Sequence, residues 1–309
     1  MLEGVGCARM RVREEGQLET AAIAPELSAD GLTVALVLLS ALLHASWNAL
    51  AKASGDPLVN VAIVTGTGSL LTLPAVLLLP APGPETWPWL AASGALHYGY
   101  QLSLVRAYRL GDLSQVYPIA RGLAPLGVAT LAAIWAAEAL APGQVVGLAL
   151  ASGAIMSLAG LRAAGPSTRG AVGMAIVTAT WIGLYTFVDG SGVRSVGQPA
   201  IYMGWSFLLG SLPIVLTAVL VRGRSALPAL RRNGPRALGG GVMATLGYVI
   251  TLWAMSRTSM AVVASLRESS VLFAAILGTR MLGEPFGRRR QWAALLLVVG
   301  LVLVQIRAV

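Results

Sequence analysis

Two arginines and one glutamate stand deep inside long apolar stretches of the sequence. Arg121 lies in "VYPIARGLAPLGVATLAAIWAA", and Arg267 and Glu268 lie in "AVVASLRESSVLFAAILG". Of the 22 lysines and arginines in the chain, only these two arginines are far from a predicted helix end. A permanent cation in such surroundings is costly unless it faces a cavity or an anion. The pattern therefore predicts either recognition of a substrate carboxylate or phosphate, or a structural ion pair.

The sequence leaves both roles open for these charges. On a helix the side chains of the neighbours Arg267 and Glu268 diverge by about 100°, so Glu268 pairs more easily with Arg121. In the alternative, Arg121 and Arg267 jointly bind an anionic group between them. One positive charge is in surplus in either case, which favours anionic or zwitterionic solutes.

Polar and aromatic side chains on several predicted helices could line a pocket around these charges. His97 and Gln101 stand one turn apart, with Tyr98 and Tyr100 beside them. His44 and Asn48, on the first predicted helix, are polar as well. In the alternative, these two residues only form hydrogen bonds to neighbouring helices. The residues expected to bind the substrate are His44, Trp47, Asn48, Tyr98, Gln101, Arg121, Trp181, Tyr185, Tyr248, Arg267 and Glu268.

Composition indicates an integral membrane protein. The chain of 309 residues is 56% hydrophobic and only 11% charged, whereas soluble domains are roughly 25% charged. The net charge of +9 is spread over short connections and forms no basic face, so we expect no nucleic-acid partner. Cys7 is the only cysteine, which excludes an intrachain disulfide and a multi-cysteine metal site.

Ten apolar windows are long enough to cross a bilayer, for which a helix needs roughly 20 residues. Residues 1–31 precede them and are predicted to form a disordered tail. The predicted fold is an all-α polytopic membrane protein with ten transmembrane helices. The windows cover residues 32–52, 58–79, 88–110, 113–137, 142–161, 170–190, 199–221, 236–257, 259–282 and 286–306.

An internal repeat divides these helices into two halves of five, residues 32–162 and 170–307. Arg121 precedes Glu138 by 17 positions (138 − 121), and Arg267 precedes Glu284 by the same 17 (284 − 267). Because five is an odd number, the second half must enter the membrane in the opposite sense. The pattern therefore predicts an inverted repeat with a binding site near the middle of the membrane.

Loop charge predicts the orientation of the chain. The odd-numbered connections between helices hold 14 lysines and arginines, whereas the even-numbered connections and both termini hold six. Lysine and arginine favour the cytoplasmic side. We therefore expect both termini to lie outside the cytoplasm, in a bacterial cytoplasmic (inner) membrane.

The sequence lacks the usual arrangements of catalytic residues. It contains no HxxxxD or HExxH pattern, no Walker loop and no nucleophile elbow. We expect no enzymatic activity, no cofactor and no bound metal, and transport driven by a gradient rather than by ATP. The leading interpretation is a secondary transporter that moves a small anionic or zwitterionic metabolite by alternating access.

Two other functions stay open at this stage. One is efflux of cationic amphiphiles coupled to protons through Glu268, since an intramembrane carboxylate can carry a proton. The other is a membrane enzyme or sensor that transports nothing. The expected partners are a small-molecule substrate and the lipid bilayer, and a homodimer is among the alternatives for the oligomeric state.

Three segments resemble the EamA family of the drug/metabolite transporter superfamily. They are "LLHASWNALAK", "RAYRLGDLSQVYPIARGLAPLGVATLAAIWAAEAL" and "LRESSVLFAAILGTRMLGEPFGRRRQWAALLLVVGLVLV". The resemblance covers about residues 32–306 and implies the ten-helix duplicated plan and transport of a small solute. It implies no single substrate, because the family moves amino acids, nucleotide-sugars, drugs and other solutes. Its members are usually drawn with cytoplasmic termini, opposite to what the loop charges favour in this chain.

Overall fold

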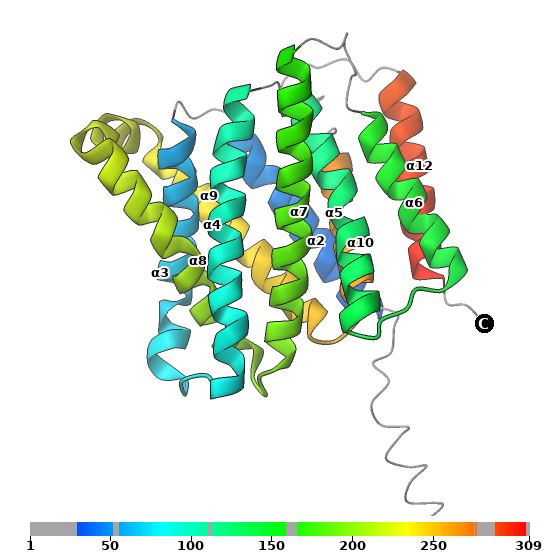
Figure 1. Ribbon diagram of the computed structural model, residues 1–309, viewed down its shortest axis with the longest axis horizontal. Helices are drawn as coiled ribbons and strands as arrows, with labels where there is room; N and C mark the ends of the chain where they lie inside the picture. Colours follow the sequence, from blue (N-terminus) through cyan, green and yellow to red (C-terminus); the bar gives the residue numbers. More distant parts are fainter. Residues whose placement is uncertain are drawn as a thin grey trace, which may run out of the picture.

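The computed structural model describes residues 30–51, 56–110, 113–158, 166–274, 276 and 288–306. Every regular element in these ranges is a helix, which confirms the predicted all-helical class (Figure 1). The elements are α2 (Gly31–Ala51), α3 (Pro57–Leu78), η1 (Pro84–Thr86), α4 (Trp87–Leu110), α5 (Leu113–Trp135), α6 (Pro142–Ser157), α7 (Pro166–Arg194), α8 (Pro199–Arg222), η2 (Gly223–Ser225), α9 (Ala226–Met255), α10 (Met260–Arg267) and α12 (Arg288–Gln305).

Six of the described helices are long and apolar enough to cross a membrane. These segments are Gly31–Asn48, Pro57–Leu78, Pro118–Trp135, Gly170–Arg194, Pro199–Ser225 and Gly234–Met255. Large apolar side chains point outward from them, and Leu78 and Leu220 are 81% and 74% exposed. Such surfaces suit contact with lipid chains, so this is a multi-pass membrane protein. The predicted total of ten spans stays a prediction, because α6 and the apolar part of α12 are shorter.

Two departures from the predicted helices stand out. Helix α9 begins at Ala226, ten residues before the predicted window 236–257, and contains Pro235 in its interior. The other departure falls in the window 259–282. Helix α10 ends at Arg267, Glu268 and Ser269 form a turn, and helical structure resumes at Ser270. The Glu268 amide donates to Ser265 O three residues back, which is the pattern of a tightened last turn. Glu284 lies outside the described residues, and so does the predicted tail except for Asp30 and Gly31, where α2 already begins.

The starts of the helices follow from local sequence. Several helices begin with proline, whose missing N–H costs nothing in the first turn. Asp56 precedes Pro57 and caps α3, because its Oδ1 accepts from Leu58 N at 3.0 Å. Its Oδ2 accepts from Arg222 Nε at 2.7 Å, which ties the start of α3 to the end of α8. Partial burial would raise the pKa of Asp56, but the hydrogen bonds from Arg222 and the helix amides outweigh it, and the pKa is lowered.

The helices pack so that the two predicted halves interleave. Helix α2 lies along α9, α4 lies along α7, and α3 packs against both α8 and α9. At one edge of the bundle α6 packs against α12, while α3 and α8 lie at the opposite edge (Figure 1). The short α10 contacts α5 and α2 in the interior. Contacts between the two halves therefore hold the bundle together.

A buried carboxylate joins four helices at one end of the bundle. Glu138, just after α5, pairs with Arg194 at the end of α7. Its Oε2 accepts from Ser259 Oγ at 3.0 Å and from Met260 N at 2.9 Å, so it caps α10. Arg194 Nε donates to Met255 O at the end of α9, at 2.7 Å. The acid is only 3% exposed, and both of its carboxylate oxygens have hydrogen-bond partners. This cluster therefore holds the ends of these helices together.

Substitution of Gly147 by leucine should separate α6 from α12. A Cβ atom on Gly147 would lie 2.6 Å from Gly300 O, and one on Gly300 would lie 2.6 Å from Gly147 O. Both obstacles are backbone, so neither can turn away, and overpacking of this kind costs about 1–3 kcal/mol or more. We expect a large loss of monodisperse protein after heating in detergent. Gly153→Leu on the same helix is the control, since nothing lies within 4 Å of its Cβ position, and equal losses would contradict the prediction.

Candidate functional site

A cavity of about 140 Å³ lies in the interior, between helices α2, α3, α4, α7, α8, α9 and α10. Its described lining is mostly aromatic and aliphatic, contains no aspartate or glutamate, and contains a single arginine. The lining residues are His44, Trp47, Val61, Val64, Thr65, His97, Tyr100, Gln101, Leu104, Tyr185, Ser206, Phe207, Gly210, Ser211, Ala244, Thr245, Tyr248 and Arg267. Such a pocket, apolar with a few placed polar groups, is typical of a small-molecule site.

Arg267 brings a positive charge to this cavity. It is the last residue of α10 and is 7% exposed. Its Cζ lies 5.5 Å from the centroid of the Tyr248 ring, within range of a cation–π contact. In the described part of the chain it forms no ion pair, and its Nε has no hydrogen-bond partner. A buried charge without a counter-ion is costly, so this guanidinium is suited to hold an anion.

Arg121 has a different environment. Its Nη2 lies 2.9 Å from Glu268 Oε1, and both side chains are buried. The same Nη2 donates to Ser270 Oγ at 3.5 Å. Neither Arg121 nor Glu268 lines the cavity. The structure therefore contains the ion pair that the sequence left as one alternative, and this pair accounts for the turn after α10, because Glu268 faces α5.

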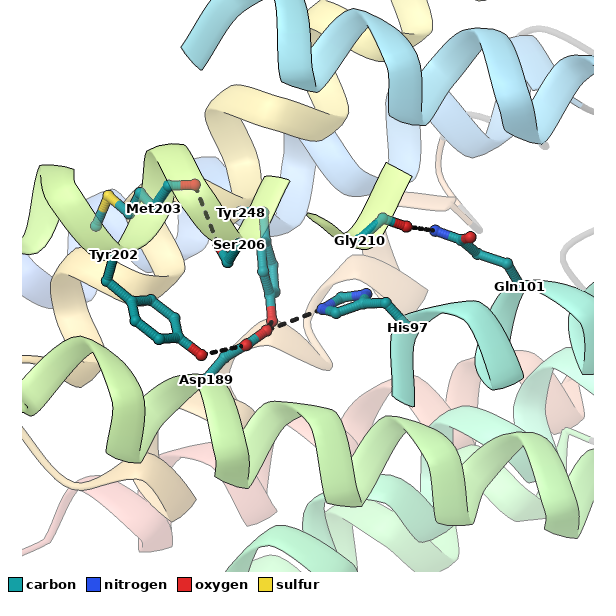
Figure 2. A network of polar contacts seen from close by, with 8 residues as sticks. All are labelled: His97, Gln101, Asp189, Tyr202, Met203, Ser206, Gly210 and Tyr248. Carbon is teal, nitrogen blue, oxygen red and sulfur yellow. Dashed lines mark hydrogen bonds and ion pairs between the residues drawn. The ribbon is translucent and has the colours of Figure 1, made fainter. Parts of the chain in front are cut away.

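A second buried acid, Asp189, lies behind the cavity wall and is hydrogen-bonded to residues that line it (Figure 2). It is 0% exposed. Its Oδ1 accepts from the Tyr202 hydroxyl at 2.8 Å, and its Oδ2 is 2.9 Å from His97 Nε2 and also accepts from the Tyr248 hydroxyl. Three donors from three other helices thus surround one carboxylate, and two of them, His97 and Tyr248, belong to the cavity wall.

Glu268 is not the only buried acid in the described part of the chain. Asp189 is as buried as Glu268, and Glu138 is 3% exposed. The predicted sixth helix ended at residue 190, which placed Asp189 at a boundary. The observed α7 continues to Arg194, so Asp189 lies more than a turn inside it.

Six of the eleven predicted binding residues line the cavity, namely His44, Trp47, Gln101, Tyr185, Tyr248 and Arg267. The other five have contacts elsewhere. Asn48 donates back to His44 O at 2.8 Å, and the Tyr98 hydroxyl is 2.9 Å from Thr217 Oγ1. Trp181 packs its ring against Gly99, and Arg121 pairs with Glu268. Binding of a substrate by any of the eleven stays a prediction.

His97 and Tyr100 were not among the predicted binding residues, although a helical pattern marks them. Tyr100 and Gln101 follow His97 by three and four residues, Leu104 follows them by four and three, and all four line the cavity. This spacing places them on one face of α4. Tyr98 is one residue off that face, which explains why it contacts α8 instead.

The described residues bring no three His, Cys, Asp or Glu side chains together in a way that could hold a metal ion. The groups at the cavity wall that can contact a solute include a guanidinium, aromatic rings, an amide and two imidazoles. Gln101 Nε2 donates to Gly210 O at 3.3 Å, while its buried Oε1 has no partner in the described chain. That oxygen can accept one hydrogen bond from a bound solute.

A family profile matches the second part of the chain. The profile of the EamA-like transporter family matches residues 169–306, from the first turn of α7 to the end of α12. The match covers 138 of the 309 residues (306 − 169 + 1), and it shows what this segment is similar to. For residues 169–306 the match confirms the resemblance predicted from the sequence, and the EamA-like family is part of the drug/metabolite transporter superfamily.

The helical arrangement of this EamA-like protein also has a counterpart among solved structures. A crystal structure matches it with a TM-score of 0.68 at 18% identity, covering 89% of this chain and 96% of that chain. At such an identity the match shows a shared fold and nothing about the substrate. The search of curated proteins finds no match.

Proposed function

We propose that this EamA-like protein is a secondary transporter that moves a small anionic or zwitterionic metabolite across the cytoplasmic membrane by alternating access. The observation that carries the proposal is Arg267, a buried guanidinium at the wall of the interior cavity without an ion-pair partner in the described chain. A carboxylate of the solute would supply the missing counter-charge and two parallel hydrogen bonds.

The size and lining of the cavity support a small solute. A volume of about 140 Å³ is close to that of cavities that hold a benzene ring. Tyr185, Tyr248 and Phe207 offer ring faces to an apolar part of the solute. The free Gln101 Oε1 can accept from an ammonium or hydroxyl group, so both an anion and a zwitterion fit these groups.

The pairing of helices supports movement of two related halves. If α2 to α6 correspond to α7, α8, α9, α10 and α12, the contact of α2 with α9 has its counterpart in that of α7 with α4. The contact of α3 with α9 likewise corresponds to that of α8 with α4. This is the pattern expected of an inverted repeat, whose halves rock about a central site. The Glu138 cluster would then hold one entrance closed.

Flux measurements in reconstituted vesicles test the function. Purified protein is incorporated into liposomes, and uptake of radiolabelled monocarboxylates, amino acids and organic cations is compared with that of empty liposomes. We expect saturable uptake of unchanged carboxylates or amino acids. Uptake of the organic cations alone would favour proton-coupled efflux through Glu268, and chemical conversion of the solute would favour an enzyme.

Fusions with a reporter that works only in the cytoplasm test the orientation. Since the odd-numbered connections carry 14 basic residues and the remaining connections and termini carry six, a fusion after Arg232 should be active and a fusion after Val309 inactive. An active fusion at Val309 together with an inactive one at Arg232 would reverse the orientation. The arrangement of the helices would be unaffected by that result.

A further inference from the structure

The two histidines of the chain both line the cavity, but their hydrogen bonds differ. His44 Nδ1 lies 3.3 Å from Trp47 Nε1 and must accept, because an indole nitrogen only donates. His97 Nε2 lies 2.9 Å from Asp189 Oδ2 and donates to that carboxylate (Figure 2). His44 therefore already uses its acceptor nitrogen in a hydrogen bond. In His97 it is the donor nitrogen that is bonded, to the Asp189 carboxylate.

The second nitrogen of His97 is open to a proton. With Nε2–H directed at Asp189, neutral His97 carries its lone pair on Nδ1, and Nδ1 has no hydrogen-bond partner in the described chain. The side chain is 18% exposed at the cavity wall. Its ring stacks on Tyr185 at a centroid distance of 4.2 Å, which fixes the ring plane. A proton arriving from water in the cavity can thus bind Nδ1 without breaking an existing bond.

Charged groups of both signs lie near the His97 imidazole. Asp189 is a carboxylate next to Nε2, and a nearby opposite charge favours the charged form of an imidazole. The positive charge of Arg267 disfavours a second positive charge on His97, unless an anion lies between the two groups. The titratable or charged groups that face His97 or the cavity beside it are Tyr100 on α4, Asp189 and Tyr185 on α7, Tyr202 on α8, Tyr248 on α9, Arg267 on α10 and His44 on α2.

We propose that His97 and Asp189 form a proton-binding site of the cavity, at which His97 takes up one proton when a carboxylate binds at Arg267. This rests on the proposed function. The proton leaves water on the side to which the cavity is open and forms the Nδ1–H bond. On release that bond breaks, and the proton returns to water on the opposite side with the anion. Asp189 stays ionised and is a positioning residue that holds the imidazole.

Binding of the carboxylate and binding of the proton are expected to strengthen each other. A carboxylate bound between Arg267 and a protonated His97 meets two positive charges instead of one. The anion therefore binds more tightly as the pH falls through the range in which imidazole titrates, and binding of the anion draws a proton to His97. The protein would carry one anion with one proton.

Nuclear magnetic resonance tests the proton site without any substrate. Protein labelled with ¹³C and ¹⁵N at histidine gives two imidazole spectra in detergent, assigned with a His44→Gln sample. Between about pH 8 and 5 we expect His97 to take up its second proton at Nδ1 before His44 does. In Asp189→Asn the same change should occur at lower pH. The proposal would be overturned if His44 takes up a proton before His97, or if His97 takes up none. Both results are read from the protein with Asp189 in place, so they hold even if Asp189→Asn fails to fold.

Calorimetry with benzoate tests the coupling. Benzoate is a flat carboxylate of the size that the cavity takes, and titrations in two buffers of different ionisation enthalpy measure the protons bound. We expect proton uptake on binding and an affinity about tenfold higher near pH 6 than near pH 8. His97→Gln should still bind benzoate, with neither proton uptake nor pH dependence. Leu102→Ala is on the same helix but is 39% exposed and outside the cavity lining, so it should keep both.

The two experiments separate this inference from the proposed function. If benzoate does not bind the wild-type protein, the anion site at Arg267 fails, and the titration of His97 still decides whether the proton site exists. If benzoate binds without proton uptake, the proposed function survives and the coupling is overturned.

Discussion

Arg267→Gln is expected to lower carboxylate uptake about ten- to a hundredfold while the protein stays folded. The glutamine keeps a hydrogen-bond donor but removes the charge, and hydrogen bonds to charged groups are worth about 1.5–3 kcal/mol, or about ten- to a hundredfold in affinity. The variant also removes a buried cation that has no ion pair in the described chain. We therefore expect its thermal stability in detergent to be equal or higher. Initial rates of uptake in liposomes and a heating series on the same samples give the two readouts.

Arg257→Gln is the matched control for Arg267→Gln. Arg257 also lies over an aromatic ring, with its Cζ 4.7 Å from the centroid of Trp253, but it is exposed and does not line the cavity. Its replacement should leave uptake close to that of the wild type. Unchanged uptake in Arg267→Gln would remove the observation on which the proposed function rests.

Arg121→Gln should destabilise the protein by about 3–5 kcal/mol, because it leaves the buried Glu268 without its partner at 2.9 Å. Adding Glu268→Gln removes the stranded charge, and two neutral amides can hydrogen-bond in its place. The double variant should therefore regain most of the lost stability and, since neither residue lines the cavity, most of the uptake. Thermal unfolding in detergent and uptake in liposomes are measured for both variants.

Arg222→Gln is the comparison for that ion pair. Arg222 and Asp56 also form an ion pair, at 2.7 Å, but their side chains are 31% and 25% exposed. A partly solvated pair contributes about 0–1 kcal/mol, so this variant should lose little stability. A double variant of Arg121 and Glu268 that is stable but inactive would assign Arg121 to substrate binding, contrary to the structure.

The helices could be predicted from the sequence to within a few residues where proline or aspartate marks their start. Pro57, Pro142 and Pro199 open α3, α6 and α8 as expected. The turn after α10 could not be predicted in this way, because "VVASLRESSVLF" contains no glycine or proline. There the break depends on Glu268 meeting Arg121, a contact between residues far apart in the chain.

At the candidate site neither the charged nor the aromatic residues were all placed correctly: of Arg121, Arg267 and Glu268 only Arg267 lines the cavity, and Tyr98 and Trp181 lie outside it. Arg267 and Tyr248 meet at the cavity as the pattern indicated. Trp181 stands four residues before Tyr185, yet it packs on Gly99 of the neighbouring helix α4, since the space beside a glycine accepts a large ring. Helical spacing gives the face on which a residue lies, but not which neighbour covers that face.

The Glu138 cluster has a consequence for synthesis of the chain. Glu138 belongs to the first half, but its partners Ser259 and Met260 follow it by 121 and 122 residues. At about 5–20 residues per second, the ribosome makes Glu138 roughly ten seconds before these partners. Its ion-pair partner Arg194 follows it by only 56 residues, and until Arg194 is made the carboxylate must stay hydrated at the membrane surface, because burying it alone is costly. The end of α5 therefore reaches its final position only after α10 has been inserted, and a chain that stops before Ser259 cannot complete that end of the bundle.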